Sequence, residues 1–176
     1  MNERAKEAEE MAKIYAIQNQ ISGNKFERNL LVPDRRVILE GEIGEIYGKK
    51  GKIRDVYCVL FNDMIITCKL DTKSLKKNKT QKMEFANKVP FDEALLIEYQ
   101  NDENKNVKNA ISVKTRKAEM ILSFDSPTRK KQWYEVIYQL ITETNVKSTF
   151  WECKHLFFYF FIFLFFYFLQ FIFFHK

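Results

Sequence analysis

Three basic residues spaced two apart are the first candidates for binding chemistry: Lys50, Lys52 and Arg54. Alternate side chains of an extended chain project to one side, so these three would converge. The same side continues with apolar residues, which places the cations at the open end of an apolar interior. A guanidinium offers a planar fork and an ammonium a mobile point charge, and both suit phosphate groups. The pattern predicts an anion-binding site, to which Lys49 and Lys69 are further contributors.

The positive charge of the chain is concentrated around this pattern. Residues 49–82 hold ten Lys and Arg against three Asp, a net +7, whereas the whole chain is +6, so the remainder sums to −1. A local basic region indicates an anionic partner such as a membrane or a nucleic acid. Proteins that bind single-stranded nucleic acid interleave cations with aromatic side chains for stacking, and residues 69–82 contain no aromatic. The sequence therefore predicts no nucleic-acid partner and leaves three alternatives: phosphoinositide contact, general attraction to anionic lipid, or a solvated lysine-rich surface.

Residues for catalysis or metal binding are scarce. Both histidines, His155 and His175, lie in or beside a Phe-rich C-terminal segment, so no serine or cysteine of the preceding domain has a histidine base within its own fold. We expect no catalytic residue, no metal site and no cofactor. Cys58 and Cys68 flank a hairpin turn at Asn62-Asp63, and a two-residue loop would point their thiols to opposite faces of the sheet. Free thiols favour a reducing, cytoplasmic compartment.

The elements that must position the basic residues are mostly strands. Residues 3–22 predict a helix with an apolar stripe of Ala8, Met11, Ala12 and Tyr15, to which Ile21 is a further candidate. Seven β-rich runs follow at Val37–Tyr47, Ile53–Phe61, Met64–Leu70, Met83–Val89, Ala94–Tyr99, Ala110–Thr115 and Glu119–Phe124. A second helix begins at the cap Ser126-Pro127 and carries Trp133, Val136, Ile137, Leu140 and Ile141 on one face. This order predicts a mainly β protein, a seven-stranded antiparallel barrel or sandwich capped by a C-terminal helix.

The C-terminal segment has a different composition, because eleven of the 17 phenylalanines lie between residues 157 and 174. Residues 156–174 as a helix would span about 28 Å, close to the ~30 Å of a hydrocarbon core. This hydrophobic tail is either a C-terminal membrane anchor or low-complexity sequence from a mispredicted gene end.

Several segments together resemble a pleckstrin-homology (PH) domain, and specifically the one that follows a Dbl-homology (DH) domain in Rho-type guanine-nucleotide exchange factors. The resemblance rests on Gly41-Glu42-Ile43, on residues 58–66 (CVLFNDMII) and on Trp133. Upstream, residues 2–23 resemble the last DH helix, and residues 30–41 resemble the junction between the two domains. The resemblance implies a remnant DH helix over 1–24, a connector over 25–35, a PH domain over 36–144, a linker over 145–155 and the tail over 156–174.

The resemblance also implies a function. Many PH domains bind phosphoinositides through a lysine, a second basic residue and an arginine, and residues 50–54 (KGKIR) are similar but more compact. The family's first lysine usually lies further upstream, where this chain has Glu40, Glu42 and Glu45. Asn2 matches an asparagine of the last DH helix that contacts the GTPase.

We therefore expect a PH module that docks on anionic phospholipid at the inner face of a membrane. In a complete protein, such a module supports exchange on a Rho-family small GTPase. Exchange activity is not expected of this chain, because most of a DH domain is absent from it. The alternative is a protein-interaction PH domain that contacts a GTPase or the DH domain and binds little lipid.

Overall fold

A computed structural model describes residues 3–23, 29–48, 51–70, 82–99 and 107–147 of the chain. One helix precedes the strands, and a second helix, over residues 127–147, follows them. The elements before that second helix are α1 (Glu3–Gln20), β1 (Ile21–Ser22), β2 (Val37–Tyr47), β3 (Lys52–Phe61), β4 (Met64–Leu70), β5 (Met83–Pro90), β6 (Leu95–Tyr99), β7 (Ala110–Lys114) and β8 (Glu119–Ser123). Within the described residues, no helix has the length and apolar character needed to span a bilayer. The tail over 156–174 lies outside them.

The strands form one sheet in the order β1-β5-β4-β3-β2-β8-β7-β6. Strand β2 curves the sheet, because it pairs with β3 over nearly its whole length and with β8 only through Gly44, Glu45 and Ile46. A Cβ on Gly44 would lie 3.0 Å from the Ile53 side chain and 3.2 Å from the Ser123 carbonyl oxygen, so any other residue at this crossing would push these neighbours aside. The seven expected strands are confirmed, and the mainly β, helix-capped fold with them.

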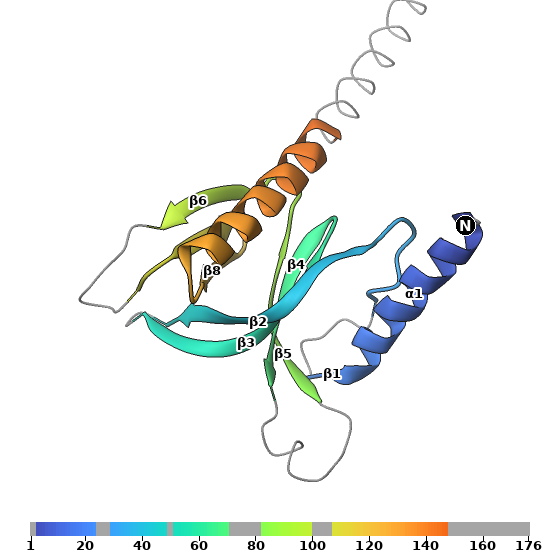
Figure 1. Cartoon of the computed structure of the whole chain (residues 1–176), viewed down its shortest axis with the longest axis horizontal. Coiled ribbons are helices and arrows are strands. Elements are labelled where there is room, and N and C mark those ends of the chain that lie inside the picture. The colour runs from blue at the N-terminus through green and yellow to red at the C-terminus, as the bar shows by residue number, and fades with distance from the viewer. Residues whose placement is uncertain (1–2, 24–28, 49–50, 71–81, 100–106, 148–176) are drawn as a thin grey trace, which may run out of the picture.

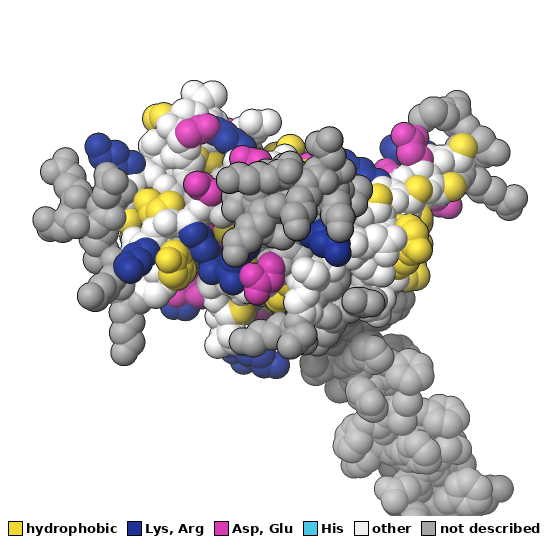
Figure 2. Space-filling view, turned by 90° about the horizontal axis from the view of Figure 1, so that it is seen from below, with side chains coloured by type: hydrophobic (Ala, Val, Ile, Leu, Met, Phe, Trp, Pro, Cys, Tyr) yellow, Lys and Arg dark blue, Asp and Glu magenta, His cyan; other side chains and the backbone are white. Residues whose placement is uncertain are grey.

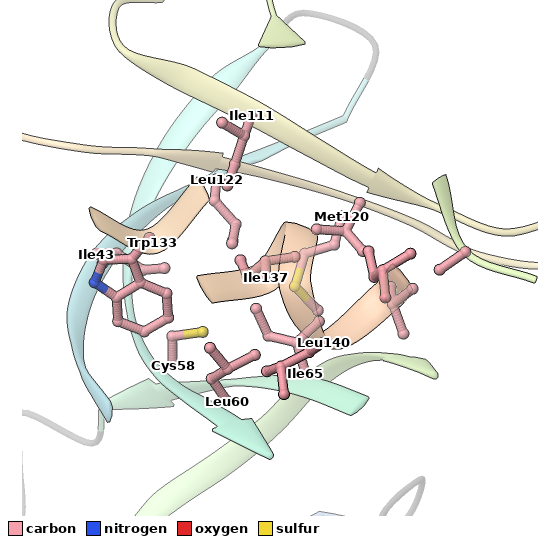
Figure 3. Packing of buried hydrophobic residues seen from close by; sticks show 14 of the residues in the cluster. Ile43, Cys58, Leu60, Ile65, Ile111, Met120, Leu122, Trp133, Ile137 and Leu140 are labelled. Carbon is pink, nitrogen blue, oxygen red and sulfur yellow. The ribbon is translucent and has the colours of Figure 1, made fainter. Parts of the chain in front are cut away.

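The inner side of the curved sheet is filled by the C-terminal helix (Figure 1). Trp133, Ile137 and Leu140 project from this helix toward side chains of β3 and β8 (Figure 3). The Trp133 ring lies 5.9 Å from that of Phe124, centroid to centroid, and is 3% exposed. The helix begins as expected, since the Ser126 hydroxyl accepts a hydrogen bond from the Arg129 amide at 3.3 Å. This helix is therefore the plug that its apolar spacing predicts.

A second core lies on the outer side of β3, β4 and β5, where α1 packs. The expected stripe is wrong for four of its members and right for Ile21: Met11 and Tyr15 are 39% and 54% exposed, and Ala8 and Ala12 are exposed as well, whereas Ile21 is buried. The buried residues of this segment are the isoleucines at 14, 17 and 21, spaced three and four apart. Isoleucine removes more apolar area from water than alanine, so the face that carries these isoleucines packs on the sheet.

The N-terminal helix ends at Gln20, two residues earlier than expected, because Ile21-Ser22 pairs in parallel with the start of β5. In the β3–β4 hairpin, Cys58 lies opposite Thr67 and Cys68 opposite Tyr57, so the two thiols point to opposite faces of the sheet, as predicted. Cys58 is buried in the inner core and Cys68 in the outer one, so both thiols are free.

Candidate anion-binding site

The end of the β2–β3 hairpin carries the residues predicted to bind anions. Gly48 and Gly51, with φ of 68° and 63°, take left-handed conformations, and the Gly51 amide donates to the Gly48 carbonyl at 3.1 Å. Lys49 and Lys50 lie between these glycines and outside the described residues, as does Asn2. Lys52 is the first residue of β3 and is exposed. Among the described residues it has no ion-pair partner.

Arg54 lies on the inner face of the sheet, at its open end. The same face of β3 continues into the inner core as Val56, Cys58 and Leu60. This confirms the prediction that the basic side chain lies at the opening and the apolar side chains lie inside. The register pairs Arg54 with Glu45 and Lys52 with Tyr47. The basic residues of β3 thus face the last residues of β2.

The guanidinium of Arg54 is already occupied by a carboxylate. Its Nε and Nη2 donate to Glu45 Oε2 at 3.0 and 2.7 Å, and its Cζ lies 4.8 Å from the centroid of the Tyr47 ring. The Asn87 amide of β5 donates to the other Glu45 oxygen at 3.5 Å. The Glu45 side chain is only 3% exposed, against 26% for Arg54. We call Glu45, Tyr47, Arg54 and Asn87 the mouth cluster.

The mouth cluster lines a hollow of about 390 Å³ at the open end of the sheet. Tyr99 and Glu119 contribute to the same hollow from β6 and β8. The Glu119 carboxylate accepts a hydrogen bond from Ser112 at 2.9 Å. Two glutamates and one arginine are among the described residues that line the hollow, and the arginine is paired with one of the glutamates. The electrostatics of this interior do not favour an anion.

Lys69 lies outside the hollow. Its Nζ is 3.3 Å from Glu84 Oε2, and the two side chains are 43% and 58% exposed. Ion pairs of this kind are screened by water and contribute at most about 1 kcal/mol, so the ammonium remains available to solvent and to ligands. The five predicted anion-binding residues thus differ in environment: Arg54 lines the hollow, Lys52 is exposed on the same strand, Lys69 is on β4, and Lys49 and Lys50 are not described.

The sequence alone missed the role of Glu45. Of the three glutamates of β2, at positions 40, 42 and 45, only Glu45 faces inward. Glu40 instead lies on the outer face, where its carboxylate contacts Lys13 of α1 at 2.9 Å. Glu40 also accepts a hydrogen bond from Tyr57, and desolvation together with this carboxylate raises the pKa of Tyr57 to about 12. The β2–β3 register sets Glu45 opposite Arg54, and a sequence that leaves the length of the connecting turn open does not reveal this pair.

The face shown in Figure 2 carries basic and acidic side chains interspersed. Apolar groups are exposed at its right-hand end. Among the described residues, no group of three or more His, Cys, Asp or Glu side chains is arranged to hold a metal ion.

A curved sheet closed by one C-terminal helix, with a polar hollow at its open end, defines a helix-capped β-barrel domain. The chain belongs to the PH domain family, whose model matches residues 37–142. This confirms the resemblance seen in the sequence.

Two curated relatives are much longer than this chain. The human "FYVE, RhoGEF and PH domain-containing protein 3" is 25% identical over 149 residues, which are 84% of this chain and 19% of that protein. The "Kinase and exchange factor for Rac B" of Dictyostelium discoideum is 33% identical over 107 residues, 61% of this chain and 9% of that protein. The chain therefore spans less than a fifth of the length of either relative.

A solved structure extends the similarity beyond the matched segment. The DH/PH domains of PDZ-RhoGEF, in complex with GTP-gamma-S activated RhoA, superpose with a TM-score of 0.56 at 13% identity. The match covers 78% of this chain, more than residues 37–142, and 41% of that chain. At this identity the match shows a common fold.

Proposed function

We propose that this chain is the PH module, with the last DH helix, of a Rho-type guanine-nucleotide exchange factor. The observation that carries the proposal is the similarity to DH/PH domains beyond the PH segment itself. Docking of α1 on β3–β5 supports it, since the helix and the barrel share a buried core. The exposed Met11 and Tyr15 on the other side of α1 suit contact with further helices of such a domain.

The module docks on anionic membrane through the basic end of the β2–β3 hairpin. Lys52 is exposed and free of ion pairs to described residues, and Lys49 and Lys50 adjoin it in sequence. Each cation close to an anionic leaflet contributes about 1 kcal/mol, so these three give weak, reversible attachment. The protein would then be cytoplasmic and peripheral at the inner face of a membrane. Exchange on a Rho-family GTPase would belong to the complete factor, and we propose that this chain alone does not catalyse it.

Vesicle co-sedimentation of the full chain tests the docking. We expect the triple variant K49A/K50A/K52A to bind vesicles of phosphatidylcholine and phosphatidylserine about 100-fold more weakly than the wild type. The matched control K6A/K117A/K131A removes the same charge from exposed lysines elsewhere and should bind nearly as the wild type does. An equal loss of vesicle affinity in both triple variants would show that binding depends only on net charge. It would contradict docking through the β2–β3 hairpin.

A second function is favoured by the pairing of Arg54. Its guanidinium is held by the buried carboxylate of Glu45, which suits a PH domain that contacts a protein and binds lipid little. The GTPase in the PDZ-RhoGEF complex is one example of a partner bound by a DH/PH pair. If the wild-type chain fails to sediment with anionic vesicles while it retains its fold, this second function replaces the first.

A further inference from the structure

The mouth cluster has a property that membrane docking alone does not require. Its only described cation, Arg54, directs two N–H groups at a single oxygen of Glu45. Glu45 is 3% exposed, and its second oxygen is reached by Asn87. The guanidinium fork that would hold a phosphate is therefore held by a carboxylate of the same chain.

We propose that Glu45 is the residue that determines specificity at this hollow: it competes as an internal anion for Arg54 and keeps phosphorylated ligands at the rim. This inference rests on the proposed function, because it concerns the same hairpin. In the wild type, phosphates are contacted by Lys52 outside the hollow, and Arg54 takes no part.

The burial of Glu45 explains why a ligand cannot easily displace it. A phosphate that drew Arg54 away would leave a carboxylate buried without its charged partner, which is strongly unfavourable. The phosphate would also face Glu119, which lines the same hollow. Both effects oppose an anion, whereas removal of the Glu45 charge eliminates the first and leaves Arg54 free to donate.

Neutralisation of Glu45 at constant size is the direct test. Glu45→Gln retains the side-chain volume and an acceptor for the Asn87 amide but removes the competing charge. Since hydrogen bonds to charged groups are among the stronger ones in proteins, we expect the affinity for inositol hexakisphosphate, measured by calorimetry on the full chain, to rise about 10-fold or more. Glu42→Gln is the matched control, because the Glu42 side chain is exposed on the other face of the same strand. Its neutralisation changes the net charge by the same amount.

Arg54 variants identify the group that is released. Arg54→Gln alone should change inositol hexakisphosphate affinity less than twofold, because Arg54 is not available in the wild type. In the Glu45→Gln background the same substitution should abolish the gain. Circular dichroism melting of each variant checks the fold, and the double variant E45Q/R54Q retains a neutral, size-matched pair in case Arg54→Gln alone unfolds.

The outcomes separate this inference from the proposed function. If Glu45→Gln binds inositol hexakisphosphate no better than Glu42→Gln, or if Arg54→Gln alone weakens wild-type binding strongly, the inference is overturned, whatever the vesicle result. If the wild type fails to bind phosphatidylserine vesicles but Glu45→Gln gains affinity for the soluble probe, membrane docking fails and the role of Glu45 stands. A gain for the soluble probe together with a gain on vesicles shows that lipid headgroups reach the hollow as well.

Discussion

Arg35, in the connector after α1, links that connector to the barrel. Its Nε donates to both oxygens of Asp63 at 2.9 and 3.0 Å, and Nη2 donates to the same carboxylate. Its Nη1 reaches the carbonyls of Asn29 and Leu30, and the guanidinium lies 5.7 Å from the centroid of the Phe61 ring. The connector after α1 is thus tied to the β3–β4 turn by a side chain that is only 10% exposed.

The magnitude of this tie follows from its burial. A bidentate, charge-assisted pair contributes about 1.5–3 kcal/mol when it is sheltered. Asp63 is 40% exposed, so water screens part of the attraction and about 1–2 kcal/mol of coupling remains. Arg35→Ala also loses the hydrogen bonds to the two carbonyls, so we expect it to lower the free energy of unfolding by about 2–3 kcal/mol in total.

A double-mutant cycle of Arg35→Ala and Asp63→Ala, read by urea unfolding of the full chain, measures the coupling. The exposed pair Arg116 and Glu93, at 3.5 Å with side chains 86% and 61% exposed, is a control whose coupling should stay below about 0.5 kcal/mol. Amide hydrogen exchange should also rise in α1 of Arg35→Ala and remain unchanged over residues 127–147. A coupling no larger than that of the control pair would refute the claim that this contact ties the connector to the barrel.

Burial underlies four other predictions. Ile14→Ala, at a site with 0% exposure, should cost about 2–4 kcal/mol in urea unfolding, whereas Met11→Ala, at 39% exposure, should cost less than about 1 kcal/mol; equal costs would contradict the observed face of α1. Trp133→Ala should lower the free energy of unfolding by about 3–5 kcal/mol and abolish the near-ultraviolet dichroism of the inner core. A smaller loss of stability than for Met11→Ala would contradict the packing of the C-terminal helix in that core. Burial raises the pKa of Cys68 to about 12 and that of Cys58 well above its usual value. In a variant whose third cysteine is replaced by serine, neither buried thiol should therefore react with Ellman's reagent at pH 8 until urea unfolds the protein. Since both pKa values are raised on folding, the stability they contribute is present below pH 9 and should be lost as the pH rises toward 12, which urea midpoints at increasing pH will measure.

Local signals were sufficient for the strands and the C-terminal helix. The two-residue turn at Asn62-Asp63 sets which residues of β3 and β4 face each other, so the opposite burial of Cys58 and Cys68 could be predicted. Large apolar residues at helical spacing after Ser126 likewise define one apolar face of the second helix, so the burial of that face could be predicted. The PH fold followed from these elements and their order.

Contacts between distant segments were decided by the tertiary structure alone. Ile21 joins a strand because Met83 lies beside it, and α1 buries its isoleucines because the outer face of β3–β5 offers an apolar surface. The pairing of Glu45 with Arg54 required the inward side of β2 to be known, since each glutamate of that strand has the same local preference. Hydrogen-bonding period and turn geometry act between near neighbours in the chain and can be read from sequence. The choice of helix face, and of the acid that meets a given cation, depends on which surfaces the folded chain brings together and removes from water.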